Sequence, residues 1–220
     1  MVYMLREHLD RVTIYHNDTG DLLPEVREIV DHVKGFAPHF VHIRGDVAGW
    51  IEENGLPSDV VPFQAHWFAE VVGQRRAKIV SRYECCYSNL MLPLWQRLQA
   101  DGVTLVIRGT KRGDFPVLPV VNGQVLEGVE FWHPLEGMTH EEVFDYLRGA
   151  GAPICRVYET GLQAPECARC PAWLNVGMGA YLRKHHPGLF ADYRARMETI
   201  TGELAPSLSN MLAEMKEISG

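Results

Sequence analysis

The sequence has no excess of basic residues, and this argues mildly against a protein that binds nucleic acid without regard to sequence. Lys and Arg together number 21 against 28 Asp and Glu, so the formal net charge is −7. Binders of that class normally carry a positive balance that neutralises phosphates. A local basic pocket is still compatible with this composition.

Long apolar runs are also missing. No stretch reaches the roughly 20 consecutive apolar residues that a membrane-spanning helix needs, and Met1–Asp10 has no signal-peptide pattern. We therefore expect a cytoplasmic protein that does not bind a membrane. Disulfides are rare in that compartment, so the five cysteines need another explanation.

Internal repeats and low-complexity linkers are absent too, which leaves a simple domain organisation. Strand-like runs alternate with helical patterns, and this order predicts an α/β domain with a parallel sheet. We expect this domain at residues 1–175 and a helical C-terminal extension at 176–220. The strand-like runs are Val12–His16, His39–Ile43, Val103–Ile107 and Val129–Trp132, and helical patterns follow Pro24, cover Pro62–Val72 and Tyr87–Leu98, follow Thr139 and include Leu189 to Ile200.

Two local patterns give sharper expectations. The continuous apolar run Val103–Ile107 is typical of a strand that is buried on both faces of a parallel sheet. The sequence Thr139-His140-Glu141-Glu142 predicts a capping box, in which the Thr and Glu side chains satisfy backbone N–H groups at the start of a helix.

Four of the five cysteines form two close pairs. Cys85 and Cys86 are adjacent, and Cys167 and Cys170 form a C-x-x-C motif. Four soft thiolates suit zinc or an iron–sulfur cluster. The alternative for the first pair is an ordinary buried position on a helix, because free cysteine is among the most buried residue types. Cys155 lies in an apolar segment and is interpreted as a core residue.

Several segments in collinear order resemble the phosphoadenosine/adenosine phosphosulfate (PAPS/APS) reductase family of the adenine nucleotide alpha hydrolase-like superfamily. The family opens a helix with two adjacent cysteines followed by Pro-Leu, and a C-x-x-C follows about eighty residues later. The matching segments here are Cys85-Cys86 with Pro93-Leu94, Cys167 and Cys170, Asp18-Thr19-Gly20 with Pro24-Glu25, Ile107 to Arg112, and Trp132 to Leu135 with Met138-Thr139.

The resemblance implies a Rossmann-like α/β fold, a metal centre and a nucleotide ligand. The metal centre would be a 4Fe–4S cluster, with zinc as the alternative, on Cys85, Cys86, Cys167 and Cys170. The ligand would be an adenine nucleotide or sulfonucleotide, whose phosphate or sulfate oxygens suit Arg donors. Its candidate binding residues are Asp18, Gly20, Arg108, Gly109, Lys111 and Arg112, for which a solvated turn is the competing interpretation.

The sequence departs from the family pattern at three places. The first strand and the S-G-G-K-D-S nucleotide loop are absent, and we expect that the natural reading frame begins upstream or that the first strand is supplied in another way. An Arg-Lys pair after the two cysteines is replaced by Asn89-Leu90. The segment Glu203–Gly220 has no cysteine, whereas the reductases carry a nucleophilic thiol in their tail.

These departures leave three functions open. The first is a PAPS reductase-like iron–sulfur protein of sulfur metabolism. The second is an ATP-pyrophosphatase-type sulfurtransferase that modifies a nucleic acid. The third is a catalytically degenerate, cluster-bearing subunit that acts through a redox or catalytic partner protein. A homo-oligomer is compatible with each of them.

Overall fold

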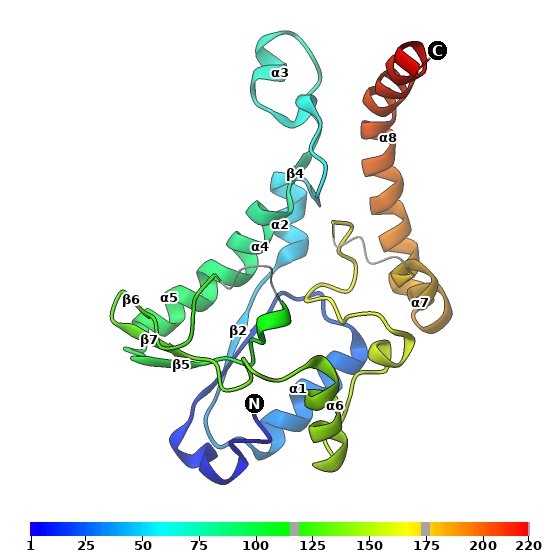
Figure 1. The fold of residues 1–220 in the computed structure, drawn as a ribbon. Helices are drawn as coiled ribbons and strands as arrows, with labels where there is room; N and C mark the ends of the chain where they lie inside the picture. Colours follow the sequence, from blue (N-terminus) through cyan, green and yellow to red (C-terminus); the bar gives the residue numbers. More distant parts are fainter. Residues whose placement is uncertain (115–118, 173–176, 220) are drawn as a thin grey trace. The chain divides into compact units, whose positions relative to one another are not determined.

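A computed structural model describes residues 1–114, 119–172 and 177–219. Helices and strands alternate along most of this chain (Figure 1). None of the helices within these ranges has both the length and the apolar character required to cross a bilayer. The strands are β1 Ile14–Asp18, β2 Phe40–Arg44, β3 Leu56–Ser58, β4 Ile79–Ser81, β5 Leu105–Ile107, β6 Val125–Leu126 and β7 Val129–Trp132. The α-helices are α1 Pro24–Phe36, α2 Val47–Asn54, α3 Phe68–Val71, α4 Arg82–Cys86, α5 Leu92–Ala100, α6 His140–Gly149, α7 Met178–His185 and α8 Pro187–Ser219, with 3₁₀ turns at Arg6–Arg11, Phe63–Ala65, Arg112–Asp114 and Arg156–Thr160 and a π-helical turn at Tyr87–Met91.

The strands form three small sheets. β1 lies beside β2, β3 pairs with β4 in parallel, and β7 pairs in parallel with β5 and antiparallel with β6. The expected mixed α/β class with parallel pairing is therefore confirmed at this coarse level. Membership of the Rossmann-like superfamily remains a prediction.

The expectation that Val103–Ile107 forms a strand buried on both faces is wrong. Only Leu105–Ile107 is a strand, and the Leu105 side chain is 46% exposed. The pairing partner of β5 in its sheet is β7, and β5 stands at the edge of the order β5-β7-β6. An apolar run alone does not reveal how many neighbours a strand has, and within the described ranges β5 pairs only with β7.

The chain folds as two compact units, and each is built from three segments. Unit 1 comprises Met1–His16, Pro24–Ile43 and Pro93–Arg156, and unit 2 comprises Asn17–Leu23, Arg44–Leu92 and Val157–Gly220. Unit 1 packs Trp95 on Phe131, with parallel rings whose centroids are 6.3 Å apart. The division into residues 1–175 and 176–220 remains a prediction, and α7 and α8 supply the helical C-terminal part.

Helix boundaries follow the capping signals more closely than the apolar pattern. α6 has the predicted box, since Thr139 accepts the Glu142 N–H and Glu142 accepts the Thr139 N–H. The continuous helix expected at Pro62–Val72 is instead a 3₁₀ turn, an extended residue at His66 and the four-residue α3. Tyr87–Leu98 divides into the π turn and α5.

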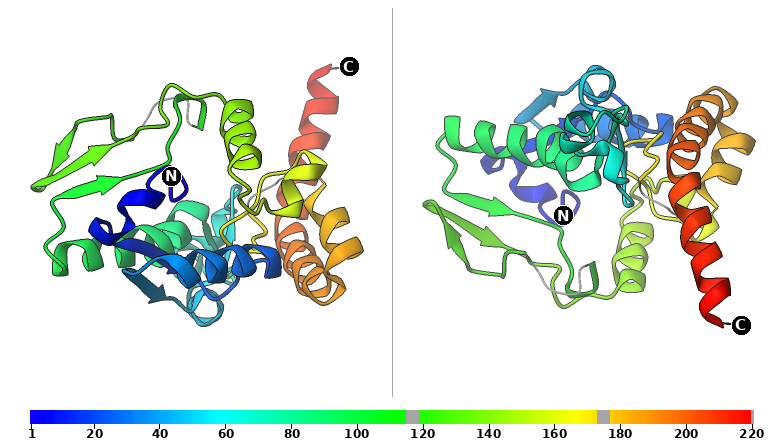
Figure 2. Two further views of the ribbon diagram at one scale, coloured as in Figure 1. Left: turned by 90° about the horizontal axis from the view of Figure 1, so that it is seen from below. Right: turned by 90° about the horizontal axis from the view of Figure 1, so that it is seen from above.

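A small core fixes the middle of α8 within unit 2. Ile200 packs with Ala65 and Ile79, and Leu56 and Leu204 pack against them. Figure 2 shows α8 continuing past this core to the C-terminus. The core joins α8 to the β3–β4 pair, and β4 leads directly into the helix that carries the first cysteine pair.

Candidate metal centre

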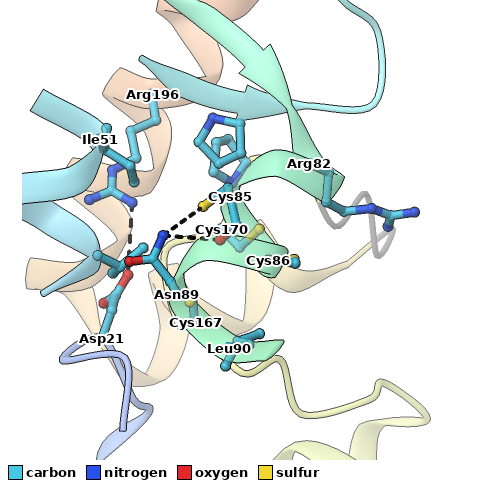
Figure 3. A pocket seen from close by; sticks show the side chains of 13 residues that line it. Asp21, Ile51, Arg82, Cys85, Cys86, Asn89, Leu90, Cys167, Cys170 and Arg196 are labelled. Atoms are coloured by element: carbon cyan, nitrogen blue, oxygen red, sulfur yellow. Dashed lines mark hydrogen bonds and ion pairs between the residues drawn. The ribbon is translucent and has the colours of Figure 1, made fainter. Parts of the chain in front are cut away.

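Four thiols from distant parts of the sequence line one pocket in unit 2. Cys85 and Cys86 come from α4, and Cys167 and Cys170 come from the loop before α7. Figure 3 shows all four side chains around the same space. No disulfide joins any of them. The structure therefore brings together the complete set of cysteines that the sequence predicts as metal ligands.

The first pair is positioned by a capped helix that follows β4. Ser81 ends β4 and accepts the Tyr83 N–H, while Glu84 accepts the Ser81 N–H, so a capping box starts α4. The short helix places Cys85 and Cys86 at its last two positions. Cys85 is buried and Cys86 is half-buried.

The π-helical turn after the pair is held by two asparagines. Asn89 is 8% exposed, and its Nδ2 donates to the Cys85 carbonyl at 3.0 Å and lies 3.8 Å from the Cys85 Sγ. Asn17 Nδ2 donates to the carbonyls of Asn89 and Leu90 at 3.0 and 2.8 Å. Such π turns are frequent at functional sites. Here the π-helical turn directs the Asn89 amide back toward the Cys85 thiol, as the dashed lines in Figure 3 show.

The second pair is anchored to the turn after β1. The Cys167 thiol donates to the Thr19 hydroxyl at 3.3 Å, and that hydroxyl donates to the Glu166 carbonyl at 3.3 Å. The Ala168 N–H donates to the Asp21 carbonyl. The turn itself requires glycine, because Gly20 has a φ of +84° and an added Cβ would lie 3.1 Å from the Gly45 carbonyl oxygen.

A buried carboxylate beside the pocket binds two guanidinium groups. The Asp21 side chain is 2% exposed, and its oxygens lie 2.8 Å from Arg169 Nε and 3.8 Å from an Arg196 amino nitrogen. Arg169 also pairs with Asp192 at 2.6 Å, and Arg196 donates to the Arg169 carbonyl. Arg196 and Arg82 both line the pocket, and Arg82 also pairs with Asp59 at 3.0 Å.

Burial favours the protonated form of three of the four thiols, Cys85, Cys86 and Cys167. The pKa of Cys85 is raised to about 12, mainly by burial and further by the neighbouring thiols Cys86 and Cys170. The Asn89 hydrogen bond and the charge of Arg196 lower this pKa in part. Burial is likewise the main cause of the raised pKa values of Cys86 and Cys167, and in each case the neighbouring Cys170 thiol adds to it. A metal cation overcomes this cost because it binds thiolates directly.

The sulfurs are spread more widely than the ligands of a single zinc ion. Tetrahedral zinc has Zn–S bonds of about 2.3 Å, which puts its sulfurs roughly 3.8 Å apart. Among the described residues, which include all five cysteines, no three sulfurs lie within 4.8 Å of one another. A donor set of four thiolates suits both zinc and an iron–sulfur cluster.

The residues predicted for nucleotide binding fall in both units. In unit 2, Asp18 accepts the Gly20 N–H at 2.8 Å, which is the turn role that competes with ligand binding. In unit 1, Arg108 and Gly109 follow β5 and are exposed. Lys111 pairs with Asp114 at 2.5 Å, and Arg112 approaches Glu136 at 3.5 Å. The nucleotide site remains a prediction.

Sequence reasoning missed the polar residues that surround the thiols. In the sequence, Asn89 stands out only as a departure from the family pattern, and Arg169 gives no signal beyond its place between two cysteines. Asp21 and Arg196 carry no local signal, since their pairing joins positions far apart in the sequence. Cys155 is 3% exposed and belongs to unit 1, as the core interpretation requires.

No family model matches the chain, and none of the curated proteins matches it either.

Proposed function

We propose that this chain is an iron–sulfur protein resembling the PAPS/APS reductases, in which Cys85, Cys86, Cys167 and Cys170 hold a 4Fe–4S cluster. The observation that carries the proposal is the convergence of these four thiols on one pocket of unit 2. When bound, such a cluster supplies a centre that accepts and donates single electrons. The chain's own residues bind it, compensate its charge and limit its contact with water.

Three groups support the ligands in distinct ways. Asn89 directs an N–H toward Cys85, and hydrogen bonds to ligating sulfur raise a cluster's reduction potential. Thr19 lies 3.3 Å from the Cys167 sulfur, and its hydroxyl can rotate to donate once that thiol has lost its proton. Arg196 brings a positive charge to the pocket lining, where it offsets the negative charge of a thiolate-bound cluster.

Metal analysis tests the cluster directly. Protein purified without oxygen should be brown and contain about four iron and four sulfide per chain. Replacing any of Cys85, Cys86, Cys167 or Cys170 with Ser should remove the colour, whereas Cys155→Ser is the matched control and should keep it. Stoichiometric zinc with no iron after anaerobic purification would contradict the proposal. Far-UV circular dichroism would separate loss of metal from loss of fold.

The resemblance extends the proposal to an adenine sulfonucleotide ligand, without sulfite release by this chain alone. Reduction of a sulfonucleotide needs a thiolate nucleophile. Four cysteines are assigned to the cluster, and the fifth, Cys155, is buried in unit 1. The chain would then act with a partner protein that supplies the nucleophile.

Two assays on one sample test this extension. Calorimetric titration with adenosine phosphosulfate should show binding that weakens as salt rises, because phosphate and sulfate contacts to Arg108 and Arg112 are ionic. A thiol-dependent sulfite assay should show no turnover. Sulfite release that survives Cys155→Ser would refute the account of the nucleophile, and absence of binding would refute the nucleotide ligand without affecting the cluster.

A further inference from the structure

The C-terminal turns of α8 carry a row of large apolar side chains that face solvent. Leu208, Met211, Met215 and Ile218 are 47%, 65%, 57% and 69% exposed, and Leu212 beside them is 64% exposed. Every residue from 205 to 219 is exposed. Figure 2 shows these turns standing clear of the other elements of unit 2. Apolar side chains concentrated in this way mark an interaction surface.

The spacing of this row is that of a coiled-coil seam. Leu204, Leu208, Met211, Met215 and Ile218 follow one another at intervals of four, three, four and three residues, which places them at alternating d and a positions of a heptad. A seam restricted to a and d positions is narrower than the apolar face of an ordinary surface helix. Leu204 packs on the core of unit 2, so the seam begins against the chain's own fold and continues beyond it.

We propose that the segment Leu208–Ile218 pairs with the same segment of a second copy of the chain, as an antiparallel coiled coil. In an antiparallel pair each a residue faces a d residue of the other helix. The seam then matches itself in four layers, with Leu208 opposite Ile218 of the second copy and Met211 opposite Met215 of the second copy, each occurring twice. We call Leu208, Met211, Met215 and Ile218 the α8 seam.

Two observations bear on the direction of the pair and on the kind of partner. The helix dipoles favour the antiparallel direction. A membrane surface is a poorer match, because Lys216 is the single basic residue in 205–219 and interfacial helices carry a basic polar face.

The exposed area predicts a weak and reversible dimer. About half to two-thirds of each side chain in the α8 seam and of Leu212 is exposed, which gives an apolar patch of roughly 500 Å². Standard stable complexes bury roughly 800 Å² on each partner, so this patch is smaller than a stable interface needs. The association should therefore depend on protein concentration. It is independent of metal binding, so its failure would leave the cluster proposal untouched.

Sedimentation equilibrium with charged seam variants tests the pairing. The wild-type chain should shift from monomer to dimer as its concentration rises about a hundredfold, by mass action. Met211→Lys and Met215→Glu should each raise the dimer dissociation constant at least ~10-fold, whereas the control Ser209→Lys, outside the seam, should not. An equimolar mixture of Met211→Lys and Met215→Glu should regain dimer, because the antiparallel register places Lys opposite Glu.

Each alternative outcome overturns a defined part of the inference. A wild-type chain that stays monomeric throughout refutes self-pairing, including the case in which another protein occupies the seam. A dimer that persists unchanged in Met211→Lys shows that another surface is used. Failure of the mixture to regain dimer refutes the antiparallel register, since parallel copies would leave the introduced Lys and Glu apart. Unchanged iron content and helicity of each variant would show that it folds.

Discussion

Neutralising Asp21 should loosen the C-x-x-C loop and the start of α8 together. Asp21→Asn keeps the shape of the side chain and most of its hydrogen-bonding capacity, but it removes the charge that faces Arg169 and Arg196. Removing one member of a buried ion pair costs about 3–5 kcal/mol, because the other charge is left uncompensated. The structure indicates a smaller effect here, for two reasons.

Arg169 keeps a second partner in Asp192, and the two arginine side chains are 22% and 16% exposed, so water reaches both. The retained Asn oxygen can still accept from Arg169. We therefore expect a loss of about 2 kcal/mol, below the range for a fully enclosed pair. A loss of that size corresponds to roughly 30-fold faster hydrogen exchange for amides protected by local opening.

Hydrogen-exchange mass spectrometry of the peptides that cover 166–172 and 188–200 measures this change. Asp192→Asn is the matched control, since it removes a charge from the same Arg169 at a site that is 57% exposed, and it should cost no more than about 1 kcal/mol. If exchange in Asp21→Asn rises less than about threefold, or equally in both variants, then the buried carboxylate does not hold this loop.

Three further expectations concern the supports of the fold. Asn17→Ala removes the side-chain donor to the Asn89 and Leu90 carbonyls and should lower the unfolding free energy by about 1–3 kcal/mol. The control Asn54→Ala loses only an exposed hydrogen bond to the Trp50 carbonyl and should change the unfolding free energy by less than about 0.5 kcal/mol. Urea titrations of both variants measure the difference, and equal losses would refute the role of Asn17. Thr139→Ala should destabilise α6 by about 1 kcal/mol while Thr139→Ser largely preserves it, and a change of equal size in both would contradict a capping role. The hydrogen bond from the Thr139 N–H holds the pKa of Glu142 below its ordinary value of 4.5. The contribution of the Glu142 carboxylate to the unfolding free energy is therefore complete above pH 4.5 and is lost as the pH falls through the lowered pKa. Glu142→Gln should flatten the acid side of a plot of unfolding free energy against pH, and an unchanged plot would refute this.

The sequence predicted those features that depend on local chemistry. The capping box at Thr139, the strand at Val129–Trp132 and the helix opened by Pro24 all appear where short-range signals placed them. The resemblance groups the two cysteine pairs into one predicted ligand set, and the structure brings the four side chains to one pocket.

Features that depend on distant partners could not be predicted in the same way. Val103–Ile107 reads as a central strand, but only the sheet order shows that β5 lies at an edge. The helix expected at Pro62–Val72 breaks at His66, whose backbone is extended. The Asp21–Arg196 contact spans most of the chain, and neither residue type is distinctive in its local sequence.

The alternation of the two units along the chain has a consequence for synthesis on the ribosome. Six segments alternate between unit 1 and unit 2, and the last of them, Val157–Gly220, completes unit 2. Cys85 and Cys86 therefore emerge long before Cys167 and Cys170, and neither unit is finished when the first pair leaves the exit tunnel. A nascent chain would expose two thiols without their partners while the 80 residues between Cys86 and Cys167 are synthesised, so metal loading must wait until the C-x-x-C has emerged.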